Sequence, residues 1–151
     1  MDNKQKKICL ILKIGMLISY IILETVFLYG IYTRAGLDGT AISAELADQI
    51  AREATIEKVS EICIYILFFI YSSVIWKWES DKRYIKYALN MFSIIFILFL
   101  WGCAFAGVQY LLMGSYTISY FMPVILLFIL MIAILLMISG KQAKADMKKE
   151  K

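Results

Sequence analysis

The sequence predicts an all-α integral membrane protein in which four transmembrane helices form an antiparallel bundle. Two observations support this fold class. The 151 residues are 62% hydrophobic and 19% charged, with a mean hydropathy of +0.74, whereas soluble chains average about 45–50% apolar and about 25% charged residues. A soluble domain of this length would also keep about a third of its surface in water. Lipid is therefore the expected surrounding of most of the chain.

Apolar runs divide the chain, treated as one domain over residues 1–151, into four expected spans. About 20 helical residues cross a hydrocarbon core of about 30 Å. The uncharged run 87–140 is too long for one span and is divided at a short polar turn with Gly. The expected spans are residues 8–32, 59–78, 87–112 and 118–139, followed by a basic tail at 140–151. The first run is longer than a leader peptide and lacks a small-residue cleavage motif after it, so a retained helix is expected.

Basic residues indicate which side of the membrane each connection faces. Of the 16 Lys and Arg residues, 13 fall in clusters at 4–13, 77–86 and 141–151, whereas the 29-residue segment 33–61 holds three basic and six acidic residues. Because basic clusters mark the cytoplasmic side, both termini are expected in the cytoplasm and the chain in the cytoplasmic membrane. Since no basic face carries base-reading residues, nucleic acid is not an expected partner.

Aromatic residues lie at the expected ends of the spans. Those at outer ends are Tyr29, Tyr32, Tyr110, Tyr116 and Tyr120, and those at inner ends are Trp76, Trp78, Tyr84 and Tyr87. Amphipathic rings favour the two membrane interfaces. We therefore expect these residues to anchor the helices.

The outer segment is expected to contain an amphipathic helix over residues 41–58. No Gly or Pro occurs between Gly39 and Gly102, so this helix can continue into the second span. Its apolar face carries Ile42, Leu46 and Ile50, opposite a charged face. This outer contact face is expected to meet the outer leaflet, another protein or the outer turn of the chain itself.

Several kinds of chemistry lack the residues they need. The chain has no His, and its three Cys residues are far apart, which argues against Ser-His or Cys-His catalysis and against a zinc site. No glycine-rich nucleotide motif occurs. Glu53 and Glu57, one helical turn apart, are interpreted as a solvated face rather than a metal site. No catalytic, cofactor-binding or metal-binding residue is predicted, and the protein is expected not to be an enzyme.

Small residues on the third span predict close helix packing. Gly102 and Ala106, and likewise Cys103 and Gly107, are spaced four residues apart on neighbouring ridges of the helix. Such pairs let helix backbones approach closely in lipid. The partner helix is expected within the same chain, with a second subunit as the alternative.

Glu24 is the candidate intramembrane polar site. It lies near the middle of the first span, where a charged side chain is costly and often functional. No basic residue is expected at its depth, so the carboxyl group is expected to be protonated or hydrated. Counting from the outer ends of the spans places Tyr71 and Ser72 at a similar depth. The structural interpretation is a neutral acid that donates a hydrogen bond between helices, and the functional one is a proton-binding site.

Two functions follow from these features. The first is a non-enzymatic accessory or regulatory subunit that acts through helix–helix and outer-face contacts with a membrane-protein partner or a second copy. The second is a small homo-oligomeric proton-coupled transporter or channel that uses Glu24. Four spans with one carboxylate midway along the first resemble the small multidrug resistance transporters, which implies the second function. The 29-residue outer segment departs from the short connection of that family.

Overall fold

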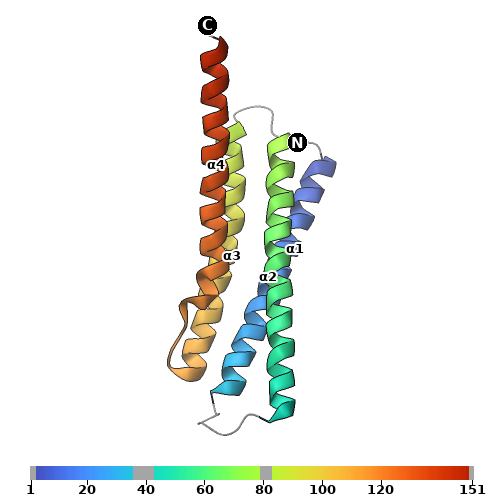
Figure 1. Cartoon of the computed structure of the whole chain (residues 1–151), viewed down its shortest axis with the longest axis vertical. Helices are drawn as coiled ribbons and strands as arrows, with labels where there is room; N and C mark the ends of the chain where they lie inside the picture. Colours follow the sequence, from blue (N-terminus) through green and yellow to red (C-terminus); the bar gives the residue numbers. More distant parts are fainter. Residues whose placement is uncertain (1–2, 36–42, 79–82, 150–151) are drawn as a thin grey trace.

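The chain folds into four long helices. The computed structural model describes residues 3–35, 43–78 and 83–149. The helices are α1 (Asn3–Arg34), α2 (Ala44–Trp78), α3 (Arg83–Met113) and α4 (Met122–Lys149), with a short 3₁₀ helix, η1 (Ile118–Phe121), before α4. They lie side by side along the long axis of the molecule (Figure 1), and α4 extends past the others at one end.

All four helices are long and apolar enough to cross a membrane, which confirms the expected number of apolar helices. At about 1.5 Å per residue, the 32 residues of α1 extend about 48 Å and the 35 residues of α2 about 52 Å. A hydrocarbon core is only about 30 Å thick. Both helices are therefore longer than such a layer is thick.

The expected outer helix is the first part of α2 and is continuous with the second span. The helix begins at Ala44, whereas residues 41 and 42 of the expected helix lie outside the described residues. Ser43 caps it, because the Ser43 side-chain oxygen accepts the backbone N–H of Leu46 at 3.2 Å. With no Gly or Pro in the helix, nothing in the sequence interrupts the backbone hydrogen bonds from this cap to Trp78.

The core is built mainly where α1 packs on α2, which is the most extensive helix pair. Buried residues recur at intervals of three, four or seven along both helices, so that one face of each helix meets the other. The fully buried apolar side chains include Met16, Tyr20, Ile64, Phe68, Tyr71 and Ile75 from this pair and Met91, Ile94, Leu98 and Leu127 from α3 and α4. Large apolar side chains also cover the outside of the helices, as expected for a surface in contact with lipid.

The connection between α3 and α4 is a short turn. Gly114 adopts a φ of 70° and its N–H bonds to Tyr110 O at 2.8 Å, which ends α3 with a left-handed residue. The buried Gln109 side chain accepts the Thr117 N–H at 3.2 Å, and Thr117 then caps η1.

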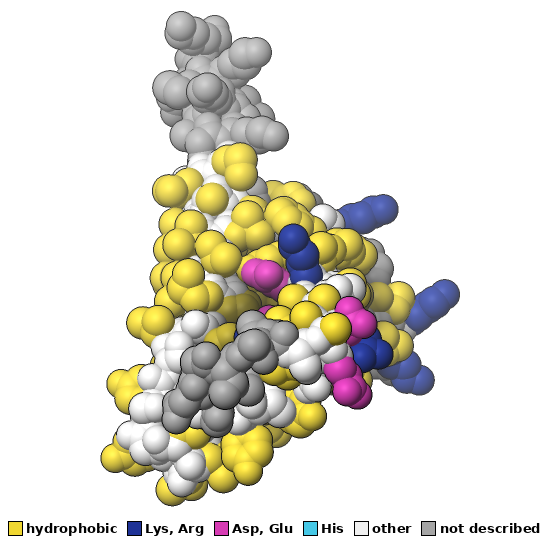
Figure 2. Space-filling model, turned by 60° about the horizontal axis from the view of Figure 1, so that its bottom comes forward, with side chains coloured by type: hydrophobic (Ala, Val, Ile, Leu, Met, Phe, Trp, Pro, Cys, Tyr) yellow, Lys and Arg dark blue, Asp and Glu magenta, His cyan; other side chains and the backbone are white. Residues whose placement is uncertain are grey.

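Figure 2 views this end of the molecule and shows charged side chains gathered on the side of α1 and α2, while hydrophobic side chains cover much of the rest.

Candidate functional site

An ion pair joins α1 to the part of α2 that precedes the apolar span. Arg34 Nη2 lies 3.1 Å from Glu53 Oε2, and Gln49 Nε2 donates to Glu53 Oε1 at 2.8 Å. The Glu53 side chain is 8% exposed and that of Arg34 44% exposed. Both carboxylate oxygens therefore have donors, which offsets the cost of burying the charge. The expectation that Glu53 lies on a solvated face is wrong, because Arg34 folds back onto it.

Gly30 makes room for this ion pair. A Cβ atom at position 30 would collide with Arg34 Nη2 and lie 3.0 Å from Glu53 Oε2. Because residues four apart on a helix are neighbours, the Arg34 side chain passes over Gly30 to reach α2. The glycine therefore helps to set which residues of the two helices face each other.

A polar line continues from this ion pair toward the middle of α1. Glu57 follows Glu53 by one turn of α2, is half-buried, and lies close enough to Arg34, Glu53 and Glu24 for their charges to interact. Glu24 itself is only 2% exposed. We call Arg34, Glu53, Glu57, Glu24 and Tyr20 the polar line. It places a second carboxyl group beside Glu24, a neighbour that the sequence did not reveal.

Glu24 and Tyr20 lie one helical turn apart on α1, close enough for their side chains to interact. The Tyr20 hydroxyl also donates to the backbone oxygen of Tyr120, at 2.6 Å. A phenol has one proton to donate, and that of Tyr20 is directed to Tyr120. The nearest polar group along α1 from Glu24 is thus the Tyr20 hydroxyl, which itself links α1 to η1.

Tyr120 of η1 lies next to Tyr20, at the Tyr20 end of the polar line. Its side chain is fully buried, between the rings of Phe27 at 5.3 Å and Phe105 at 6.3 Å. Among the described residues its hydroxyl has no hydrogen-bond partner, although it lies close enough to Glu24 for an electrostatic interaction. A buried hydroxyl without a partner is costly. The Tyr120 hydroxyl is therefore a polar neighbour of Glu24 that makes no described hydrogen bond.

Tyr71 and Ser72 lie in other surroundings. The Tyr71 ring centroid is 5.6 Å from Lys13 Nζ, near the beginning of α1, and Ser72 Oγ lies 2.5 Å from the Tyr87 hydroxyl of α3. The described contacts therefore do not bring these two residues to Glu24. The physical reason is the register of α1 and α2: the Arg34–Glu53 pair places Glu24 opposite the region of Glu57.

The small residues of α3 divide between two surfaces. A Cβ atom at Gly102 would lie 2.7 Å from Tyr20 Oη and 3.2 Å from Phe121 Cε1, so Gly102 packs inside the chain. Ala106 is half-buried, whereas Cys103 and Gly107 are exposed, and a Cβ atom at Gly107 would meet no atom within 4 Å. Only the ridge of Gly102 is thus closely packed within this chain.

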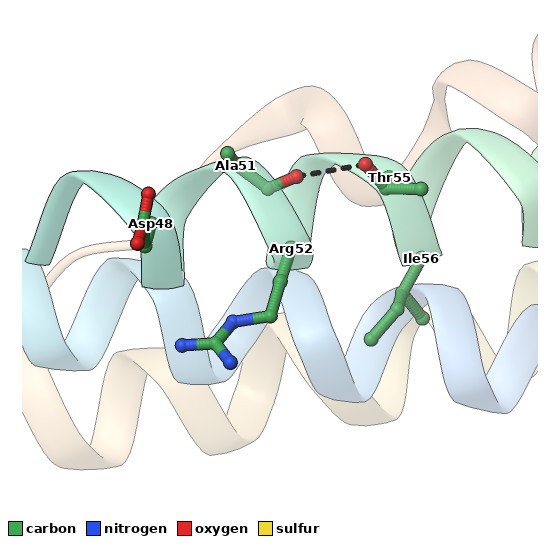
Figure 3. A pocket seen from close by; sticks show the side chains of 5 residues that line it. All are labelled: Asp48, Ala51, Arg52, Thr55 and Ile56. Atoms are coloured by element: carbon green, nitrogen blue, oxygen red, sulfur yellow. Dashed lines mark hydrogen bonds between the residues drawn. The ribbon is translucent and has the colours of Figure 1, made fainter. Parts of the chain in front are cut away.

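The expected outer contact face is only partly exposed. Ile42 lies outside the described residues, and Leu46 and Ile50 are half-buried on the side of α2 that also carries Glu53. A different side remains exposed, with a shallow open pocket of about 500 Å³. Figure 3 shows the five residues that line it, all on α2: Asp48, Ala51, Arg52, Thr55 and Ile56. We call them the outer strip.

Two aromatic residues expected at the membrane interfaces are buried instead. Tyr120 and Tyr87 are both 0% exposed, because they pack between helices and their neighbours hold them there. Tyr29, Tyr32, Tyr110 and Tyr116 are exposed, as interface anchors require. Neither Tyr20 nor Tyr120 was expected from the sequence in the surroundings of Glu24. Tyr20 could have been identified as a neighbour by its spacing of four from Glu24, whereas no sequence feature places Tyr120 near Glu24.

Within residues 3–35, 43–78 and 83–149, no group of three or more Cys, Asp or Glu side chains is placed to bind a metal ion. Comparisons with protein-family models, with curated proteins and with solved structures found no match to this chain.

Proposed function

We propose that this protein is a non-enzymatic accessory or regulatory subunit that recognises another membrane protein through the outer strip. In this proposal the four helices cross the cytoplasmic membrane as an antiparallel bundle with both termini in the cytoplasm. The basic clusters at 4–13, 77–86 and 141–151 support that orientation, because such clusters are retained on the cytoplasmic side.

The observation that carries the proposal is the rigid beginning of α2. The exposed side of this helix changes from charged residues, Asp48 and Arg52, to the apolar residues Ile56 and Val59, which are 45% and 55% exposed. Such a change is expected where a helix enters the hydrocarbon layer. Residues 44–55 would then stand outside the membrane, held against α1 by the ion pair of Arg34 and Glu53.

A preformed helix surface suits protein recognition. Because α1 already orders this helix, a partner that binds the outer strip would not bear the entropic cost of ordering it. The strip combines a negative, a positive and an apolar side chain within two helical turns, so a partner needs complementary charges beside an apolar contact. Acidic residues at 45 and 48 disfavour an outer helix that lies flat on lipid.

Site-specific photo-crosslinking in native membranes tests this function. A photoreactive residue in place of Thr55, in the outer strip, is expected to capture one partner protein in a stoichiometric adduct. The same residue in place of Lys58, which is exposed on α2 outside the strip, is the matched control. The adduct should disappear in an Arg52→Glu variant. Adducts formed only between two copies of this chain, or equally at both positions, would contradict the proposal.

The polar line favours a second candidate, a homo-oligomeric proton-coupled transporter or channel. Glu53, Glu57 and Glu24 place carboxyl groups at successive levels between the outer end of α1 and its middle. Proton exchange between such groups is the chemistry that this candidate requires.

Reconstitution into liposomes that contain a pH-sensitive dye distinguishes the two candidates. Proton movement with the natural chain, lost in Glu24→Gln and kept in the control Glu45→Gln, would favour the transporter. The subunit proposal expects no proton movement above that of empty liposomes with any of the three proteins.

A further inference from the structure

A pocket of about 230 Å³ opens between three helices, at the end of the molecule opposite the Arg34–Glu53 pair. It lies where α1 begins, α2 ends and α3 begins. Its lining includes Lys6, Cys9 and Lys13 of α1, Tyr71 and Ile75 of α2 and Asn90 of α3. Two of the described lining residues are basic and none is acidic, so the pocket favours an anion.

Lys13 has unused hydrogen-bonding capacity in this pocket. Its Nζ donates to Ser93 Oγ at 3.1 Å and lies 5.6 Å from the centroid of the Tyr71 ring. An ammonium group carries three protons, so two remain for a ligand beside this one bond. Among the described residues, no salt-bridge carboxylate lies within 4 Å of Lys13. A half-buried ammonium group between apolar helices is stabilised by an anion.

Tyr71 provides a second, independent observation. The residue is 0% exposed, and within the described part of the chain its hydroxyl has no hydrogen-bond partner. The hydroxyl lies near Cys9, which also lines the pocket. A buried hydroxyl without a partner is costly, and a ligand oxygen or a water held by that ligand would satisfy it.

We propose that this pocket binds the phosphate of an anionic phospholipid headgroup. Lys6 and Lys13 are seven residues apart on α1, so their side chains extend from the same face about two turns apart. The oxygens of a phosphate bound between them accept hydrogen bonds from both ammonium groups. The amide of Asn90, which uses one N–H for Lys86 O at 3.0 Å, offers its second N–H from α3. Basic pockets between membrane helices recognise lipid headgroups in this way.

Apolar side chains beside the pocket identify a lipid rather than free phosphate as the source. Leu10, which also lines the pocket, is 57% exposed, and Leu89, adjacent to Asn90 in the sequence of α3, is 64% exposed. Acyl chains attached to the bound phosphate can cover these surfaces, which free phosphate would leave uncovered. The inference is independent of the proposed partner, because it concerns the opposite end of the bundle.

Native mass spectrometry of the purified full chain tests the proposal. Protein in a neutral detergent is mixed with phosphatidylglycerol or with phosphatidylcholine, and retained lipid is counted. The natural chain is expected to retain one phosphatidylglycerol in preference to phosphatidylcholine. Lys6→Met and Lys13→Met should each weaken this binding by roughly fivefold, from the usual attraction between one basic residue and an anionic headgroup.

Lys58→Met, at the opposite end of the bundle, is the matched control and should bind as the natural chain does. Lys6 is exposed, so its variant keeps the test valid even if Lys13→Met fails to fold. Tyr71→Phe should also weaken retention while preserving the ring below Lys13. Equal retention by the Lys6, Lys13 and Lys58 variants would overturn the proposal. Complete displacement of the lipid by inorganic phosphate would overturn the lipid source.

Discussion

Arg34 of α1 and Glu53 of α2 form an ion pair over Gly30, with Arg34 Nη2 3.1 Å from Glu53 Oε2. The two residues are 19 positions apart in the sequence and lie on either side of the connection between the helices. The pair occurs in the same register as the apolar packing of α1 on α2. In that register Glu57 lies near Glu24.

Removal of Arg34 should destabilise the protein. Arg34→Leu leaves the largely buried Glu53 carboxylate with Gln49 as its described donor. We expect the free energy of unfolding to fall by about 1–3 kcal/mol, the cost of an unsatisfied buried group. Titration with sodium dodecyl sulfate in mixed micelles measures it. Arg52→Leu, the same substitution at an exposed position, should change it by less than about 0.5 kcal/mol. Equal effects of the two substitutions would argue against the ion pair.

Gly102 and Gly107 should respond in opposite ways to alanine. A Cβ atom at Gly102 would lie 2.7 Å from Tyr20 Oη and would disturb the bond from Tyr20 to Tyr120. Overpacking of this kind costs about 1–3 kcal/mol. At Gly107 the space is open, so alanine should be neutral or should stabilise the helix by up to about 1 kcal/mol. Thermal unfolding in detergent compares the two, and a more stable Gly102→Ala variant would contradict the packing described.

Glu24→Gln should fold almost as well as the natural chain. The amide keeps a polar group with hydrogen-bonding capacity and nearly the same volume, so the expected loss is about 1 kcal/mol or less. Glu24→Ala removes both the polar group and the packing and should cost clearly more. The detergent titration used for Arg34 measures this difference. A Gln variant as unstable as the Ala variant would show that Glu24 is needed as a carboxylate.

Cysteine labelling tests the orientation along a single helix. Asp48 and Lys77 are exposed near opposite ends of α2. On a background without the three native cysteines, Asp48→Cys should react with an impermeant maleimide in intact cells, and Lys77→Cys should react only after lysis. The reverse pattern would contradict cytoplasmic termini.

Replacement of Leu46 and of Ile56 by Asp separates folding from recognition. Leu46 is half-buried on the side of α2 that carries Glu53, so Leu46→Asp should lower the melting temperature. Ile56 is 45% exposed in the outer strip, so Ile56→Asp should leave the melting temperature close to that of the natural chain while it abolishes the crosslink at position 55. Scanning fluorimetry and the crosslinking assay are the two measurements. Loss of the crosslink in Leu46→Asp alone would exclude the outer strip.

The amino-acid sequence by itself determined the number of helices and their approximate ends. Long apolar runs can satisfy their backbone hydrogen bonds in lipid only as helices or closed barrels, and runs of about 20 residues suit helices. The run free of Gly and Pro from residue 40 onward likewise predicted the continuity of α2, because no residue in it breaks a helix. These are local properties, and each is encoded within one segment.

Only the tertiary structure decided which residues meet. The register of α1 and α2 includes a bond between Arg34 and Glu53 over Gly30, three positions whose periodicity carries no sign of their contact. In that register Glu57, rather than Tyr71 or Ser72, lies near Glu24. The burial of Tyr120 arose in the same way, since hydropathy is equally compatible with an anchor at the interface and with a ring between helices. Apolar periodicity predicts which face of a helix is buried. Which residues of the neighbouring helices bury that face depends on how the whole helices pack.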